Sequence, residues 1–360
     1  MSYIWQFYLL LAIILFQGIL LAFISKRGQN VFLWLCFLEL SFLAGFREWY
    51  IGNDTHHYVS TFIATINHMD ISLSYMEKGY ILYNQFIALF TSNPQAILLV
   101  TALIVTGSIC YFIRKYSTVV LIPILLFVIL QFGASMCIMR QYLAISIVLC
   151  SMSFVVKRQF IPFLLCCALA TSVHYSATIS LGLYFIYPLP FKIKYLFWCF
   201  VGTMLAFIFL APLLDPIFTI TGRYENYQGS ILLGEETKIA SIIKTTVQFV
   251  IAVFCCFSYR YVLRKDSICN VKLPPQFLLW CSIISFCLHF ISIRGTVLER
   301  LALYYATFSI ISISFFVRCY NPKIRPLIGM GLIGCFILYQ SIIFIYRPTW
   351  NQILPFRFCF

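Results

Sequence analysis

Residues 3–24, YIWQFYLLLAIILFQGILLAFI, carry no charged side chain and are followed by the basic pair Lys26 and Arg27. A helix needs about 20 apolar residues to cross the hydrocarbon core of a bilayer, so this stretch predicts a membrane-spanning helix. No small-residue cleavage site follows it. We therefore interpret it as a first span and not as a removed signal peptide.

The composition extends this interpretation to the whole chain. Of the 360 residues, 62% are hydrophobic and 10% are charged, whereas soluble domains contain about 25% charged residues. The mean hydropathy is +0.94. A soluble fold cannot cover so much apolar surface, which indicates a polytopic membrane protein. Most of the fifteen cysteines lie inside apolar runs without metal-ligand spacing, so we predict neither a disulfide framework nor a metal site.

The length criterion predicts an all-α protein with about twelve transmembrane helices (range 10–13). We place them at residues 3–24, 30–46, 95–113, 117–134, 138–156, 160–174, 175–189, 195–214, 240–259, 276–293, 300–318 and 327–346. The pair 160–174 and 175–189 is short for two crossings. Residues 80–91 are too short for one, which favours a re-entrant or interfacial segment. We find no internal repeat and no soluble domain, so we expect a single transmembrane domain over residues 1–360.

Lysine and arginine predict the orientation, because cytoplasmic loops carry an excess of both. Fifteen of the 25 basic residues lie in one alternating set of short loops. These are Lys26, Arg27, Arg114, Lys115, Lys157, Arg158, Lys192, Lys194, Arg260, Arg264, Lys265, Lys272, Arg318, Lys323 and Arg325. Both termini and the two long loops, 47–79 with short helices and 215–239, then face outward. The net charge of +14 follows from this pattern, and we predict no nucleic-acid partner.

Other ionisable residues gather on the predicted outer side. Residues 46–58, FREWYIGNDTHHY, hold five of them, and Arg140 and Arg300 begin apolar spans. Loops solvate charges anywhere, and Arg140 could also snorkel to the interface. However, ionisable groups at membrane depth usually face a cavity or a partner. Glu299, Arg300 and Tyr304 are close on a helix, since positions four apart share a face.

These residue types suit the binding of a phosphorylated lipid. The planar fork of arginine matches phosphate, and several arginines at the outer membrane edge suit a lipid-linked diphosphate. The imidazole of His174 can accept a proton near pH 7, although a histidine hydrogen-bonded in helix packing is the alternative. We do not predict a metal at His56, His57 and Asp54, because adjacent side chains on a helix point about 100° apart. We interpret His289 as packing.

Five segments resemble, in order, segments of EpsG/Wzy-type polysaccharide polymerases: FREWYIGNDTHHYVSTF at 46–62, MRQYLAISIVL at 139–149, HYSA at 174–177, ERLALYY at 299–305 and WNQILPFRF at 350–358. The family has an Arg…Gly-x-Asp…Tyr segment, an Arg-Gln helix, a His-containing helix pair, an Arg…Tyr segment and a Trp…Pro-aromatic tail. Phe356 stands where tyrosine is common in that tail. The resemblance extends from residue 42 to residue 358.

The resemblance implies a GT-C-like glycosyltransferase of the hexosyltransferase type in a bacterial inner membrane, with its active site facing the periplasm. It implies transfer of a growing glycan from undecaprenyl diphosphate to a lipid-linked repeat unit. An O-antigen polymerase of lipopolysaccharide biosynthesis is the first choice, and a capsule or exopolysaccharide polymerase stays open. The expected partners are the lipid-linked repeat units, the bilayer, a chain-length regulator and a flippase. No cofactor is expected, because the donor already carries its leaving group.

A mechanism follows as a hypothesis. Negative charge that develops on the diphosphate needs stabilisation, which arginines would supply in place of a divalent metal. The predicted substrate-binding residues are Arg47, Arg140, Arg223, Arg294, Arg300, Tyr58 and Tyr304, where the tyrosines orient sugar rings or serve as ordinary membrane anchors. The acceptor hydroxyl needs a general base, predicted as Asp54 or His174, with Glu299 third. Direct displacement would invert the anomeric carbon.

Two other classes of membrane protein share this composition. A flippase of lipid-linked glycans would also be polytopic, but it would be expected to show internal repeats and matching broken helices. An O-antigen ligase would carry one larger outer loop. A sugar acyltransferase usually has an early histidine within a helix, which the first two predicted spans lack.

Overall fold

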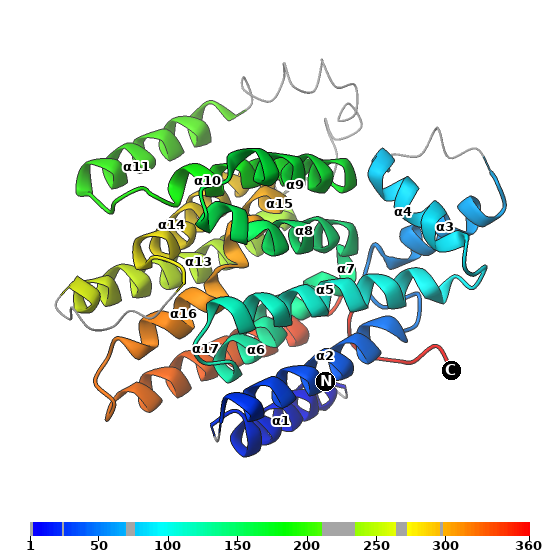
Figure 1. Ribbon diagram of the computed structural model, residues 1–360, viewed down its shortest axis with the longest axis horizontal. Coiled ribbons are helices and arrows are strands. Elements are labelled where there is room, and N and C mark those ends of the chain that lie inside the picture. The colour runs from blue at the N-terminus through cyan, green and yellow to red at the C-terminus, as the bar shows by residue number, and fades with distance from the viewer. Residues whose placement is uncertain (1–2, 24, 70–75, 211–234, 264–271, 296–297) are drawn as a thin grey trace. The chain divides into compact units, whose positions relative to one another are not determined.

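The computed structural model describes residues 3–23, 25–69, 76–210, 235–263, 272–295 and 298–360. Within these ranges every regular element is a helix, and the one β-type contact is an isolated bridge between Arg47 and Phe358 (Figure 1). Eight of the described helical segments are long and apolar enough to cross a membrane. The prediction of an all-helical polytopic membrane protein is confirmed.

The eight long segments correspond to predicted spans. They are α1 (Ile4–Leu21), α2 (Lys26–Gly45), α5 (Gln95–Tyr116), α8 (Met139–Val156), α13 (Glu235–Leu263), α14 (Pro275–Ser292), the pair α15 (Glu299–Ala306) and α16 (Ser309–Arg318), and α17 (Arg325–Tyr346). The helix α2 begins before the predicted start at residue 30, because the Ser25 hydroxyl caps it by accepting from the Gly28 amide at 2.9 Å.

Shorter apolar helices occupy the other four predicted spans. The first, Leu121–Cys137, comprises α6 (Leu121–Phe127), the π-helical segment η1 (Val128–Phe132) and α7 (Gly133–Cys137). The second is α9 (Phe160–Val173). The third comprises the 3₁₀ helix η2 (Tyr175–Leu181) and α10 (Gly182–Ile186), and the fourth is α11 (Ile193–Ile208). A crossing needs about 20 residues, so twelve crossings stay a prediction.

The described helices pack as two compact units. Unit 1 comprises Met1–Thr178 and Tyr320–Phe360, and unit 2 comprises Ile179–Cys319. In unit 1, α5 packs against both α2 and α8, and α8 packs against α9. Gly45 allows the close approach of α2 to α5, since a Cβ atom there would lie 3.0 Å from the Leu99 Cα atom. Small residues at helix contacts are typical of membrane bundles.

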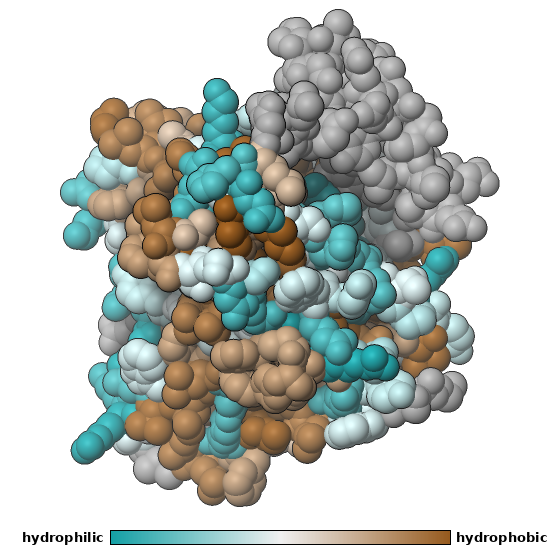
Figure 2. All heavy atoms as spheres, turned by 90° about the vertical axis from the view of Figure 1, so that its right-hand side faces the viewer, coloured by the Kyte–Doolittle hydropathy of each residue, from teal (hydrophilic) through white to brown (hydrophobic). Residues whose placement is uncertain are grey.

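Two short helices of unit 1 follow α2. The helix α3 (Thr55–Ile66) lies within the predicted loop 47–79, and α4 (Lys78–Ala88) is too short to cross a bilayer. They pack against each other, and α4 also packs against α9. Figure 2, which views the molecule from the side of α3 and α4 in Figure 1, shows hydrophilic side chains interspersed with hydrophobic ones on this side. Of the predicted loop 215–239, only residues from Glu235 onward, in α13, are described.

The C-terminal tail of unit 1 forms backbone hydrogen bonds with the segment between α2 and α3. Besides the Arg47–Phe358 bridge, the Glu48 amide donates to the Arg357 carbonyl at 3.0 Å and the Cys359 amide donates to the Phe46 carbonyl at 2.9 Å. The two ends of the family resemblance, FREWYIGND and WNQILPFRF, therefore lie side by side.

In unit 2, α14 is the central helix. It packs against α11, α13, α15 and α16. Its buried face carries Phe277 and Trp280, and Phe277 meets Phe308 edge-on with ring centroids 5.4 Å apart. This contact lies at the junction of α15 and α16, because Phe308 is the N-cap residue of α16.

Candidate functional site

Arg140 lies in the first turn of α8, where the helical path changes. Ile138 has φ −102° and ψ 54°, so it separates α7 from α8. Arg140 forms an ion pair with Glu77, and their side chains are 14% and 8% exposed. A largely buried charge needs an opposite charge or several hydrogen bonds, and here the ion pair fixes the position of the guanidinium.

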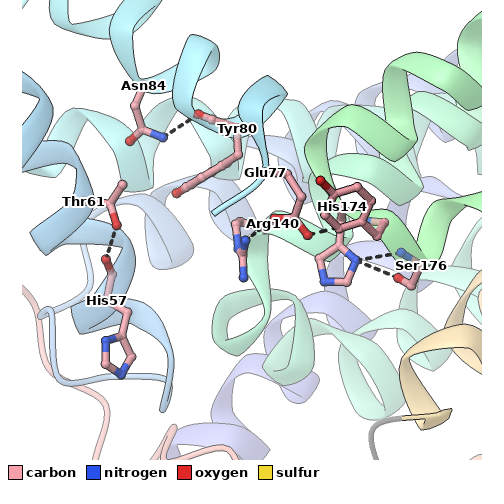
Figure 3. A network of polar contacts seen from close by, with 9 residues as sticks. His57, Thr61, Glu77, Tyr80, Asn84, Arg140, His174 and Ser176 are labelled. Carbon is pink, nitrogen blue, oxygen red and sulfur yellow. Dashed lines mark hydrogen bonds and ion pairs between the residues drawn. The ribbon is translucent and has the colours of Figure 1, made fainter. Parts of the chain in front are cut away.

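Glu77 connects three segments of unit 1. It is the N-cap residue of α4, and its Oε2 atom accepts from Arg140 Nη1 on α8. Its Oε1 atom accepts from the Tyr175 amide, after α9, at 3.4 Å. Figure 3 shows the carboxylate between Arg140 and His174. One acid therefore brings α4, α8 and the end of α9 to a common point.

The His174 ring has a defined hydrogen-bonding pattern. Its Nδ1 atom lies 3.3 Å from the Ser176 amide and 2.7 Å from the Ser176 hydroxyl (Figure 3). A backbone amide can only donate, so Nδ1 is the acceptor, and the neutral ring carries its hydrogen on Nε2. In this tautomer Nε2 is a hydrogen-bond donor.

Two tyrosine rings flank Arg140. Its Cζ atom lies 5.6 Å from the ring centroids of both Tyr58 on α3 and Tyr80 on α4, which is within cation–π range. Burial raises the pKa of Tyr80, so its phenol stays protonated. Arg140 Nε has no hydrogen-bond partner among the described residues, whereas the Tyr80 phenol interacts with the Asn84 side chain. A buried guanidinium N–H between two aromatic rings is suited to donate to an anionic or hydroxylated ligand.

Arg47 has a different environment in the same unit. It is 2% exposed, and its guanidinium donates to four oxygen acceptors and to the Met139 sulfur at 3.7 Å. The oxygen acceptors are the carbonyls of Ala44, Ile51 (3.3 Å) and Met136 (2.9 Å) and the hydroxyl of Thr55 (3.4 Å). Burial lowers the pKa of Arg47 to about 10, which still leaves it charged at neutral pH.

The space beside Arg47 is too small for a substrate. A cavity there, lined in part by Thr101, Ser135 and Met136, has a volume of about 10 Å³. That is room for about one water molecule, whereas a diphosphate group is several times larger. The contacts of Arg47 therefore favour a structural role, in which it joins the end of α2 to the turn before α3 and to α7.

Asp54 begins α3 as its N-cap residue and is half-buried. Tyr58 follows one helical turn later, so both residues lie on one face of α3. The same face carries the ring beside Arg140. His56 and His57 are exposed, and their rings are tilted by 79°, so the two imidazoles do not converge.

Unit 2 contains a second ion pair, between Glu299 at the start of α15 and Lys244 on α13. Their side chains are 19% and 25% exposed, more than those of Glu77 and Arg140. His289 on α14 is buried, and its Nδ1 donates to the Ser285 carbonyl at 2.8 Å. These contacts agree with the interpretation of His289 as packing.

The other predicted residues of unit 2 have distinct surroundings. Arg294 is exposed, and its Nη1 atom donates to the carbonyls of Phe207 and Ile208 at 3.3 Å each. Arg294 thereby caps the C-terminus of α11, where a cation also complements the helix dipole. Arg300 is half-buried next to Glu299, and Tyr304 is fully buried.

A family model described as the EpsG family matches residues 30–358. The chain belongs to the EpsG family. Its members are polysaccharide polymerase-like membrane proteins, so the resemblance predicted from the five segments is confirmed. No curated protein and no solved structure matched the chain.

The predicted site of this EpsG-family protein divides between the two units. Arg47, Asp54, Tyr58, Arg140 and His174 lie in unit 1, and the structure brings Tyr58, Arg140 and His174 around Glu77. A separate set lies in unit 2: Arg294, Glu299, Arg300 and Tyr304. Arg223 lies outside the described residues.

The sequence analysis did not predict three residues of the polar cluster around Glu77 and of the Lys244–Glu299 pair. Glu77, Tyr80 and Lys244 do not stand out in sequence, because their partners are distant along the chain. One signal was available for Glu77. The chain has only eleven acids, and an acid is a common partner of a buried arginine. An acid directly before an apolar segment, as Glu77 is, was therefore a candidate partner for Arg140.

Proposed function

We propose that this EpsG-family protein is an O-antigen polymerase of a bacterial inner membrane, with a GT-C-like arrangement of helices. It transfers a growing glycan from undecaprenyl diphosphate to a lipid-linked repeat unit at the periplasmic face. The observation that carries the proposal is the Arg140–Glu77 pair between Tyr58 and Tyr80. It combines a fixed cation, a buried guanidinium N–H without a partner among the described residues, and aromatic rings, which are the groups that bind a diphosphate-linked sugar.

The reaction is a displacement at the anomeric carbon of the donor. The acceptor hydroxyl oxygen forms a bond to that carbon, and the bond from the carbon to the diphosphate oxygen breaks. The electron pair leaves with undecaprenyl diphosphate, and the hydroxyl proton passes to a base. Direct displacement inverts the anomeric configuration. The reaction needs no nucleotide, because the leaving group is already attached.

Arg140 stabilises the leaving diphosphate in this mechanism. Glu77 accepts from Nη1 of Arg140, which leaves Nε unpartnered within the described residues. The guanidinium can therefore keep its ion pair and still donate to a phosphate oxygen. A preorganised donor of this kind is worth about 2.7–4 kcal/mol of transition-state stabilisation.

Asp54 is the preferred general base. It shares a face of α3 with Tyr58, the residue whose ring lies against Arg140. His174 is a weaker choice, because the hydrogen bonds at Nδ1 leave Nε2 protonated, so His174 is better suited to donate to a phosphate or sugar oxygen. Glu299, in unit 2, is the third candidate and is already paired with Lys244.

The proposal is tested by polymerisation in vitro, with the purified full-length protein in vesicles and one lipid-linked repeat unit. We expect a ladder of products that persists in a chelator. Asp54→Asn should abolish the ladder, with a loss of about 10²–10⁴-fold, as for a missing general base. Ser60→Ala, at an exposed position of α3, is the matched control. A folded wild-type protein that cannot extend the glycan would refute the function.

Cells distinguish a polymerase from a flippase. In a strain that lacks its own polymerase, the Asp54→Asn variant should leave single-unit glycans on the surface. A complete absence of surface glycan, at normal protein level, would instead indicate a defect in lipid-linked glycan transport and would contradict the proposal.

A further inference from the structure

Unit 2 contains a groove away from its ion pair. The groove lies where α11, α13 and α14 meet and has a volume of about 170 Å³. Both α11 and α13 pack against α14, and the groove lies between them. Apolar side chains line nearly all of it, and among the described residues the one charged side chain in its lining is that of Arg260 on α13.

The groove has an aromatic end and a cationic end. At one end, Phe286 of α14 lies between Phe200 and Phe249, with ring centroids 6.2 and 5.3 Å away. At the other end Arg260 is exposed, and its Cζ atom lies 5.4 Å from the ring of Phe257. The guanidinium therefore rests at the rim of the groove, where it keeps access to water and to polar groups outside.

The length of the groove matches one leaflet of a bilayer. Phe249 and Arg260 are eleven positions apart on α13, which at 1.5 Å per residue is about 16 Å. The hydrocarbon core is about 30 Å thick, so one leaflet contributes about half of it. Arg260 lies one turn before the end of α13, so it would meet the headgroup level when an acyl chain fills the apolar part.

We propose that this groove is a binding site for one anionic phospholipid, with an acyl chain along α13 and the phosphate on Arg260. The complementarity of charge selects an anionic headgroup over a zwitterionic one. Arg260 belongs to the basic loops that predict the cytoplasmic side, whereas the diphosphate site is predicted on the outer side. The occupant is therefore a phospholipid of the leaflet next to Arg260 and not the glycan carrier, and the proposal is independent of the proposed function.

Native mass spectrometry of the full-length protein in detergent tests the site. The probes are phosphatidylglycerol, phosphatidylcholine with the same acyl chains, and undecaprenyl phosphate. Wild-type protein should retain one phosphatidylglycerol in preference to the other two lipids. Arg260→Gln should weaken retention about fivefold, as expected for one arginine near an anionic headgroup. Lys157→Gln, which removes an exposed charge after α8 in unit 1, should leave retention unchanged.

A second pair of variants tests the apolar part of the groove. Val253→Phe places a ring inside the groove and should reduce phosphatidylglycerol retention while Arg260 is intact. Val250→Phe adds the same ring at an exposed position on the same helix, outside the lining, and should have no effect. Equal retention by wild type, Arg260→Gln and Val253→Phe would overturn the proposal. A preference for undecaprenyl phosphate would overturn it too, because the groove would then belong to the carrier.

Discussion

Arg47 and Arg140 have the same sequence context, because each lies beside the end of an apolar span. Their surroundings in unit 1 nevertheless differ. The four oxygen acceptors of Arg47 are neutral and belong to the segments that it joins. Arg140 has one acidic partner, two aromatic neighbours and an unpartnered Nε among the described residues. A guanidinium whose donors are used by backbone carbonyls joins the segments that carry those carbonyls. A guanidinium that is held by a single carboxylate has N–H groups available for a ligand.

The sharpest test of this difference is a double variant, Arg140→Gln with Glu77→Gln. Arg140→Gln alone leaves a buried carboxylate unpaired and should cost about 3–5 kcal/mol of stability. Neutralising Glu77 as well should restore most of that stability. Polymerisation should nevertheless stay about 10²–10³-fold below wild type, because the donor to the diphosphate is missing. Thermal unfolding and the in vitro ladder measure the two effects, and a stable double variant with normal activity would show that Arg140 only supports the fold.

Arg47→Gln should have the opposite result, with reduced stability and nearly unchanged activity per folded molecule. The substitution leaves several buried carbonyls without a donor, so we expect a loss of about 3 kcal/mol in stability and less folded protein in the membrane. The fraction that folds should polymerise at nearly the wild-type rate per molecule. Activity normalised to folded protein is the measurement. A stable Arg47→Gln protein that is inactive would place Arg47 among the substrate-binding residues, as the sequence first predicted.

These two arginines also show what a sequence can and cannot predict. Hydropathy located α1, α5 and α17, because a bilayer requires long apolar helices whatever their neighbours are. The partner of Arg140 was beyond reach, since Glu77 lies 63 positions away and no local pattern joins them. For the same reason the bridge between Arg47 and Phe358 could not be predicted, since it joins the segment after α2 to the C-terminal tail. Helix existence is local information, whereas side-chain pairing depends on how helices pack.

The ion pair of unit 2 gives a smaller expected effect. Lys244 and Glu299 are more exposed than the pair of unit 1, so solvent screens their attraction, and we expect Lys244→Gln to cost about 1 kcal/mol or less. Its polymerisation rate should remain within a few-fold of wild type. Glu299→Gln should behave in the same way if Asp54 is the base. A drop in rate with Glu299→Gln as large as that with Asp54→Asn, at unchanged stability, would move the base to unit 2.

The smallest expected effect on polymerisation comes from removing the hydrogen bonds that hold the FREWYIGND segment to the C-terminal tail. Asn53 is exposed, and its side-chain amide donates to the carbonyls of Thr349 and Trp350 at 3.1 and 2.8 Å. Asn53→Ala removes both hydrogen bonds but leaves their acceptors open to water, so we expect a loss of about 0.5–1.5 kcal/mol. The neighbouring Asp54 would keep its place through the helix α3, and polymerisation should be unchanged. Hydrogen exchange of the Gly52 amide, which donates to the Gln352 carbonyl at 3.1 Å, reports the loosening directly. If exchange there is unaltered while the ladder shortens, Asn53 contacts the glycan, and the tail contributes to the substrate site as well as to the scaffold around Arg47.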